Sequence, residues 1–181
     1  MKILIFTWRD IRNPAAGGAE VFTHQISSRL AAKGHEVTLF TSTFRGCKNE
    51  EILDDVRIIR AGGRYTVYLH ARVYYKKYFK GKYDVVVDEI NTVPFFTPTF
   101  VKNGEKIIAL IFQLAREFWS HEMHFPINYL GYYVLEERWL KNYIDIPTIT
   151  ICSSTKQDLL KLGFKKIFIV PIGLTIKPLE N

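Results

Sequence analysis

The sequence predicts an α/β domain with a Rossmann-like, doubly wound and mostly parallel sheet that carries helices on both faces. Two observations lead to this fold class. Apolar runs of strand length alternate with segments whose apolar residues recur every three or four positions, and this alternation is typical of βαβ units. The run Val85–Val87 is continuously apolar, as expected for a strand of a parallel sheet that is buried on both faces.

Seven strands are predicted, each an apolar run bounded by polar residues, proline or glycine. Residues 44–55 are mostly polar and are predicted to form a loop. The predicted strands are residues 3–6, 35–41, 56–60, 83–90, 106–112, 147–152 and 166–170.

Helices are predicted in the intervals between these strands. Phe22, Ile26 and Leu30 recur every four residues and form one apolar stripe, and Gly34 is a typical helix stop. Ser154 or Thr155 is a suitable N-cap for the last helix. The predicted helices begin near residues 19, 66, 94, 127 and 153 and end near residues 33, 79, 100, 143 and 162.

The chain is organised around the segment that joins the first strand to the first helix. An apolar strand ends at Phe6, a loop containing Gly17 and Gly18 follows, and a helix opens at Ala19-Glu20. Strand, glycine loop and helix form a phosphate-binding arrangement, because the unpaired amides of the first helical turn face outward. The Glu20 carboxylate would repel a nearby phosphate, so we expect it to contact a sugar hydroxyl or a backbone donor. An ordinary strand-to-helix turn is the alternative.

Length and composition fit one globular, cytosolic domain. The chain has 181 residues, of which 48% are apolar and 24% are charged, values that exclude a disordered chain. No segment approaches the ~20 apolar residues that span a bilayer. Cys47 and Cys152 match no metal or redox spacing, which favours a reducing compartment.

The net charge of +7 is concentrated in one basic and aromatic segment, residues 57–82, which has no acidic residue. Such a segment can meet an anionic membrane surface, a phosphorylated substrate or a nucleic acid. The alternative is a helix with a solvated basic face and tyrosines packed on the sheet. We favour a membrane surface over a nucleic acid, and the candidate membrane-facing residues are Arg72, Lys76, Lys77 and Lys80.

Polar residues gather where several predicted strands end. In doubly wound sheets, ligands bind in the crevice at these carboxyl ends. A shared cleft is therefore predicted from four groups at these ends. They are the glycine loop, the strand-end acids with Asn91, the segment after the fifth strand and the serines after the sixth. These groups are Gly17 and Gly18; Asp88, Glu89 and Asn91; residues 113–117; and Ser153 and Ser154.

Several other sites are excluded by their missing motifs. The glycines are adjacent and the second strand ends in Thr41-Ser-Thr43, which does not fit a dinucleotide fingerprint with its acidic ribose ligand. A Walker-type phosphate loop and a nucleophile elbow are also lacking. His121, Glu122 and His124 lack further ligands in the sequence, so no metal site is predicted.

An ordered set of motifs resembles the N-terminal half of a group-1 (family 4) glycosyltransferase of the GT-B fold. Each motif is loose alone, but their order is fairly specific, and together they cover nearly the whole chain. They are Gly17-Gly-Ala-Glu20, Gly34-His-Glu-Val37, Gln113-Leu-Ala-Arg-Glu117, Ser153-Ser-Thr155 with Asp158, and Val170-Pro-Ile-Gly173.

The resemblance implies a division of labour between two Rossmann-like domains. Residues 1–170 would be the acceptor-side domain and residues 171–181 the start of an interdomain linker, with the donor-binding domain absent and this fragment inactive alone. Such enzymes retain anomeric configuration and need no metal or other cofactor. Their substrates would be a nucleotide-sugar donor and a saccharide or glycolipid acceptor in cell-envelope glycan synthesis, with transfer of a hexosyl unit at the cytoplasmic face of the membrane.

Site roles follow from the same resemblance and from the strand ends. Gly17 and Gly18 would lie against the donor diphosphate, with Glu20 near the sugars. The predicted catalytic residues are Gln113 and Glu117, and the predicted substrate-binding residues are Gly17, Gly18, Glu20, Glu89, Asn91 and Arg116.

Two features depart from the family pattern. Many relatives have histidine at the end of the fifth predicted strand, where this chain has Phe112, so Gln113 or the donor phosphate would take over its role. The chain also ends where the second domain should begin, which leaves a truncated or a naturally split enzyme open. The competing function is a non-catalytic α/β module that docks on an anionic membrane surface or a partner subunit.

Overall fold

The computed structural model describes residues 1–114 and 136–173. Its single sheet has the order β3-β4-β2-β1-β5-β6-β7-β8, and every pairing except β3–β4 is parallel. The predicted fold class is confirmed. The strands are β1 (Lys2–Phe6), β2 (Glu36–Thr41), β3 (Glu50–Leu53), β4 (Val56–Arg60), β5 (Val85–Ile90), β6 (Lys106–Ile111), β7 (Thr148–Thr150) and β8 (Ile167–Ile169).

Helices connect these strands much as the periodicity predicts. The helix after the first glycine loop and the basic helix both appear, the latter continuing as a π-helix. For the helix predicted at 127–143, only its end lies within the described residues. The helices are α1 (Gly18–Ala32), α2 (Val67–Tyr74) with η1 (Tyr75–Phe79), α3 (Thr97–Phe100), α6 (Glu136–Leu140) with the 3₁₀ turn η3 (Lys141–Tyr143), and α7 (Ser153–Lys161).

The prediction of a loop over residues 44–55 is wrong for residues 50–53, which form the edge strand β3. β3 pairs antiparallel with β4 through a two-residue turn at Asp54 and Asp55, whose φ values are 49° and 61°. Aspartate tolerates this left-handed turn. The charges that suggested a loop are matched across the pair, since Arg57 Nε lies 2.7 Å from Glu50 Oε1.

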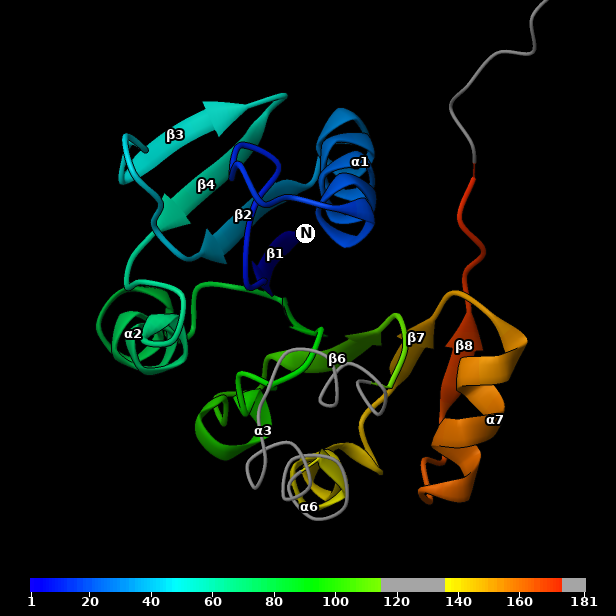
Figure 1. Cartoon of the computed structure of the whole chain (residues 1–181). Coiled ribbons are helices and arrows are strands. Elements are labelled where there is room, and N and C mark those ends of the chain that lie inside the picture. Colours follow the sequence, from blue (N-terminus) through cyan, green and yellow to red (C-terminus); the bar gives the residue numbers. More distant parts are fainter. Residues whose placement is uncertain (115–135, 174–181) are drawn as a thin grey trace, which may run out of the picture.

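The helices cover both faces of the sheet, because the chain adds strands on both sides of β1. β1 leads through α1 to β2 on one side, whereas β5 leads to β6, β7 and β8 on the other. Right-handed crossovers therefore place α1 on one face and the later helices on the opposite face, as Figure 1 shows for α1 and α2. The carboxyl ends of β1 and β5 lie at the point where the strand order reverses, which is the usual ligand position.

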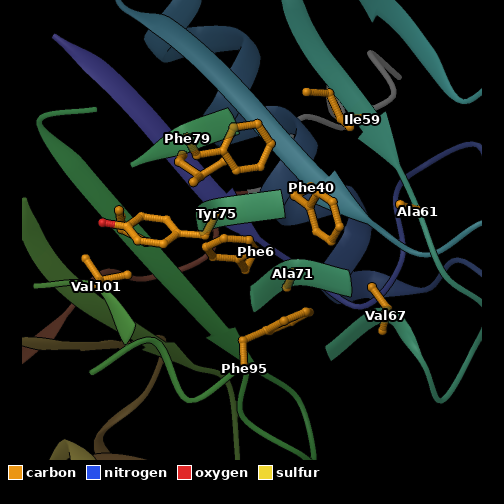
Figure 2. Close-up of a cluster of buried hydrophobic side chains, with 12 residues drawn as sticks. Phe6, Phe40, Ile59, Ala61, Val67, Ala71, Tyr75, Phe79, Phe95 and Val101 are labelled. Carbon is orange, nitrogen blue, oxygen red and sulfur yellow. The ribbon is translucent and has the colours of Figure 1, made fainter. Parts of the chain in front are cut away.

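The largest apolar cluster lies between the sheet and the α2–η1 helix. Figure 2 shows Phe6 and Phe40 of the sheet facing Tyr75 and Phe79 of η1, with Phe95 beside them. The Phe6 and Phe40 rings pack edge to face at a centroid distance of 5.6 Å. The alternative for the basic segment was a solvated basic face with tyrosines packed on the sheet. Its second part is correct, because the inward aromatic residues of this helix pack on the sheet.

The start of α7 differs from the prediction. Cys152, and not Ser154 or Thr155, occupies the N-cap position. Its half-buried thiol lies 3.2 Å from the hydroxyl of Ser154 and 3.2 Å from that of Thr155. These two hydrogen bonds lower the pKa of Cys152 to about 7, and the bond with Ser154 has the larger effect.

Candidate active site

A cavity of about 700 Å³ opens at the carboxyl ends of β1, β5, β6 and β7. Its wall combines the start of α1 with residues that follow these strands, so the predicted shared cleft is present in part. Five of the predicted site residues line it: Gly17, Gly18, Glu20, Asn91 and Gln113.

Glu20 is turned toward the protein and holds the start of α1. Its side chain is 2% exposed. Oε2 accepts a hydrogen bond of 2.7 Å from the amide of Gly17, and Oε1 accepts one of 3.0 Å from Nε of Arg9. The expected contact with a backbone donor is therefore the one that the structure shows, and it closes a capping-box interaction.

The glycine loop leaves two first-turn amides for a ligand. The amide of Gly17 is occupied by Glu20, but those of Gly18 and Ala19 belong to the first turn, whose N–H groups have no intrahelical partner. Both residues line the cavity. A Cβ built on Gly18 would meet no atom within 4 Å, and one on Gly17 would meet only Glu20 Oε2 at 3.6 Å. The lack of side chains at Gly17 and Gly18 thus leaves open space beside the start of α1, and no neighbouring atom requires glycine there.

Asp88 and Glu89 point to opposite faces, as neighbours in a strand do. Asp88 faces the α3 side, where it accepts hydrogen bonds from the amides of Phe95 and Thr97 at 3.1 Å and from the Tyr143 hydroxyl. Burial raises its pKa above the usual carboxyl value. Asp88 therefore anchors the segment after β5 and does not reach the cavity.

Glu89 lies beneath α1 and is not among the cavity-lining residues. Its carboxylate is 1% exposed and accepts hydrogen bonds from the Thr23 hydroxyl at 2.6 Å and from Asn91 Nδ2 at 3.2 Å. Asn91 itself lines the cavity. Of the two predicted substrate-binding residues at the end of β5, the structure thus brings Asn91 to the cavity and places Glu89 behind it, where it orients the Asn91 amide.

Replacing Glu89 with glutamine is expected to remove part of the pH dependence of folding stability. Burial raises the pKa of Glu89 to about 7 from an ordinary value of 4.5, so the folded protein holds an extra proton between these two pH values. The contribution of Glu89 to stability is therefore fully present below pH 4.5 and is lost as the pH rises through 7, a change of roughly 3 kcal/mol.

Urea unfolding of the wild type and the Glu89→Gln variant at pH 5 and pH 8 checks this expectation. Relative to the variant, the wild type should lose roughly 3 kcal/mol of unfolding free energy between the lower and the higher pH. A difference that stays constant across this range would show that Glu89 does not titrate there.

Phe112 and Gln113 form the wall at the end of β6. The Phe112 ring packs edge to face on Phe22 of α1 at a centroid distance of 5.3 Å, so this position supplies an apolar wall and no proton-transfer group. Gln113 is exposed and lines the cavity. Arg116 and Glu117, which were predicted beside it, lie outside the described residues, as do His121, Glu122 and His124. Among the residues that the structure describes, no group of three potential metal ligands occurs.

Trp8 and Arg9 were not predicted as site residues, but they follow β1 after Thr7 and line the cavity. The Arg9 guanidinium lies over the Trp8 indole with its carbon 4.2 Å from the ring centroid. Their position near the carboxyl end of a strand was the sequence signal that could have identified them as site residues. Ser153 and Ser154 are not among the lining residues, whereas the preceding Ile151 is.

The predicted membrane-facing residues lie away from the cavity on α2, η1 and the turn that follows. Arg72, Lys76, Lys77 and Lys80 are all exposed. Two apolar side chains of the same helix, Leu69 and Val73, are 69% and 58% exposed. Arg60, by contrast, is buried in an ion pair with Asp10 and adds nothing to this surface. In the described parts of the chain, every helix is too short or too polar to cross a membrane.

Comparisons with known proteins identify a family and a similar fold. The model of Glycosyltransferase Family 4 matches residues 16–177. Among solved structures, a sucrose-phosphate synthase from Thermosynechococcus elongatus is similar, with a TM-score of 0.64 and 15% sequence identity over 96% of this chain and 48% of that chain. At this identity the likeness concerns the fold, and this chain spans about half the length of the synthase. A search of curated protein sequences finds no match.

Proposed function

The chain belongs to Glycosyltransferase Family 4, and from this membership we propose that it is the acceptor-side half of a nucleotide-sugar-dependent, retaining glycosyltransferase. Its substrates are a nucleotide-sugar donor and a saccharide or lipid-linked acceptor of the cell envelope, to which it transfers a hexosyl unit. No metal, other cofactor or nucleic acid takes part. A second domain, beginning beyond a linker at residues 171–181, supplies the remaining donor-binding groups.

One observation supports this proposal above the others. The cavity at the switch point of the sheet joins the glycine loop, Asn91 and Gln113, which are polar groups from three separate strand ends. The fold is that of one half of a GT-B glycosyltransferase. A site that is open on one side and built from a single domain suits an enzyme whose two substrates meet between two halves.

The chemistry proposed for this site is substitution at the anomeric carbon. The bond from that carbon to the departing diphosphate oxygen breaks, and a bond to the acceptor hydroxyl oxygen forms on the same face of the sugar. The hydroxyl proton passes to the departing phosphate oxygen, because Phe112 offers no base. Negative charge grows on the diphosphate, and the amides of Gly18 and Ala19 can stabilise it as preorganised donors.

Gln113 is the described residue best placed to orient the acceptor hydroxyl. It is exposed to the cavity, and an amide can accept from and donate to sugar hydroxyls. Arg116 is proposed to bind the acceptor and Glu117 to help orient it, as the family resemblance implies.

Product analysis tests the reaction type. Transfer from UDP- and GDP-sugars is measured with saccharide and lipid-linked acceptors, and the anomeric configuration of the product is read by NMR. We expect a product with the configuration of the donor and turnover that persists with a chelator. An inverted product, or loss of turnover with the chelator, would contradict the proposed mechanism.

A second proposal concerns the surface of α2 and η1, which we propose docks on an anionic membrane. The exposed pair Leu69 and Val73 lies four residues apart on one helix face, next to Arg72, Lys76 and Lys77. A basic helix with exposed apolar side chains is typical of interfacial binding. Docking would bring the cavity close to lipid-linked acceptors. If the protein catalysed no transfer, membrane docking would be its function as a binding module.

Changing Lys76, Lys77 and Lys80 together to glutamate is expected to weaken binding to vesicles with anionic lipid by at least about a hundredfold. Each basic residue near such a surface contributes about 1 kcal/mol, and reversal adds repulsion. Vesicle sedimentation at two salt concentrations measures the effect.

The matched control changes three exposed lysines elsewhere, Lys33, Lys102 and Lys166, to glutamate and so alters net charge equally. If both triple variants lose binding to the same extent, net charge alone attracts the protein and the α2–η1 surface has no specific role.

A further inference from the structure

The backbone on both sides of Arg9, which lines the cavity, is held by hydrogen bonds. On one side, the amide and hydroxyl of Ser42 both donate to the carbonyl oxygen of Trp8, at 3.2 and 2.6 Å. On the other, the carboxylate of Asp10 accepts two hydrogen bonds from Arg60, at 2.7 and 2.9 Å. The backbone of Arg9, which lies between these two anchors, therefore has little conformational freedom.

The side chain of Arg9 is also fixed before any ligand binds. Its Nε donates to Glu20 Oε1 at 3.0 Å, and its guanidinium lies over the Trp8 indole at 4.2 Å. Arginine loses rotamer entropy when its side chain is ordered. Because Glu20 and Trp8 order Arg9 in the folded protein, a ligand does not have to bear that cost.

The outer edge of the guanidinium is available to a ligand. Arginine has five N–H donors, and Glu20 takes the one at Nε. Within residues 1–114 and 136–173, no partner is found for the donors on the two terminal nitrogens. The side chain is 26% exposed and lines the cavity, so these nitrogens form a planar fork suited to two oxygens of one phosphoryl group.

The surroundings of Arg9 favour an anion. Among the described lining residues, Arg9 and Arg29 are cationic and Glu20 is the acid, which leaves one net positive charge. The Glu20 carboxylate is already engaged at both oxygens. Gly18 and Ala19 line the same cavity, and their amides add donors with the favourable dipole of a helix start.

We propose that Arg9 is the cationic phosphoryl ligand that this half of the enzyme contributes, held in place by Glu20 and Trp8. This inference rests on the proposed glycosyl transfer and adds a named cation to it. The phosphoryl group is either that of the donor diphosphate or one carried by the acceptor, since both present the same oxygens. Glu20 is a positioning residue for Arg9 and does not itself touch the phosphate.

The test is NMR titration of the chain with UDP, inorganic pyrophosphate, a hexose 6-phosphate and uncharged uridine. In the Arg9→Gln variant, we expect the dissociation constant of the phosphate-bearing ligands to rise 10- to 100-fold, as the loss of two charge-assisted hydrogen bonds implies. Arg12→Gln is the matched control, because Arg12 is an exposed arginine of the same loop that does not line the cavity. It should change binding less than twofold.

Arg9→Lys separates geometry from charge. Lysine keeps the positive charge but lacks the planar fork, so binding should lie between those of the wild type and Arg9→Gln. Weakened UDP and pyrophosphate binding identifies the donor diphosphate as the ligand, and weakened hexose 6-phosphate binding alone identifies an acceptor phosphate.

Two results would overturn the assignment of Arg9. One is equal binding by the Arg9→Gln and Arg12→Gln variants, and the other is wild-type binding of uridine as tight as that of UDP. Either result would leave the proposed function intact if sugar transfer is observed. Failure of the function itself would appear as an absence of transfer with every donor, whatever the titrations show.

Discussion

Replacing Arg60 with methionine is expected to lower the free energy of unfolding by about 3–5 kcal/mol. The Arg60 and Asp10 side chains are 0% exposed, and they form a bidentate pair at 2.7 and 2.9 Å. Arg60 also bonds to Glu51 at 2.6 Å and to the Lys48 carbonyl at 2.9 Å. Removing it leaves the Asp10 carboxylate buried without its cation, and that uncompensated charge is the source of the loss.

Arg57→Met is the matched control for this prediction. Arg57 lies on the same strand and pairs with Glu50, but its side chain is 50% exposed, so water screens the pair and replaces it when it is lost. Exposed pairs contribute about 0–1 kcal/mol. Urea unfolding of both variants, with unchanged slopes, measures the difference. Similar losses from the two variants would show that burial of the Asp10–Arg60 pair does not govern its effect.

Replacing Gly18 with leucine is expected to reduce sugar transfer at least about a hundredfold while the fold is unchanged. A Cβ at Gly18 meets no atom within 4 Å, so the substitution costs the folded protein little. The new side chain stands at the first turn of α1, where it blocks approach to the Gly18 and Ala19 amides. Loss of a preorganised donor to developing charge costs about 10²–10³ in rate.

Two further variants control for the substitution itself. Gly18→Ala adds one methyl group in open space and should retain most of the activity. Gly63→Leu makes the same change outside the cavity, where a Cβ would contact only Thr66 Oγ1 at 3.9 Å. Transfer rates and unfolding midpoints are measured for all three. Normal transfer by Gly18→Leu would mean that the glycine loop does not contact the donor.

Local patterns predicted most of the fold. Gly34, the glycine expected to end the first helix, does so with a positive φ of 85°, and the apolar runs become strands. β3 was missed because its acids Glu50 and Glu51 suggested a solvated loop. Their partners are Arg57 and Arg60, and pairing across an antiparallel edge is decided by contacts that strand propensity does not contain.

The candidate site could be predicted only in part, for two physical reasons. Alternation along a strand separates adjacent side chains, so Asp88 and Glu89 could not both face the cavity, and neither lines it. The partners that fix this loop are in part distant in the sequence, since Arg9 bonds to Glu20 eleven residues on and Asp10 to Arg60 fifty residues on. Composition shows that such charges exist but cannot show which of them is buried.

Binding of UDP, GDP and their sugar conjugates tests the central proposal most directly. Calorimetry is carried out on this chain alone and on any longer form of the protein that its gene encodes. Tight binding of a nucleotide-sugar by the longer form and much weaker binding by the chain alone is the result expected of half of a two-domain transferase. Absence of binding in both, together with salt-sensitive attachment to anionic vesicles, would contradict it and leave a membrane-docking module.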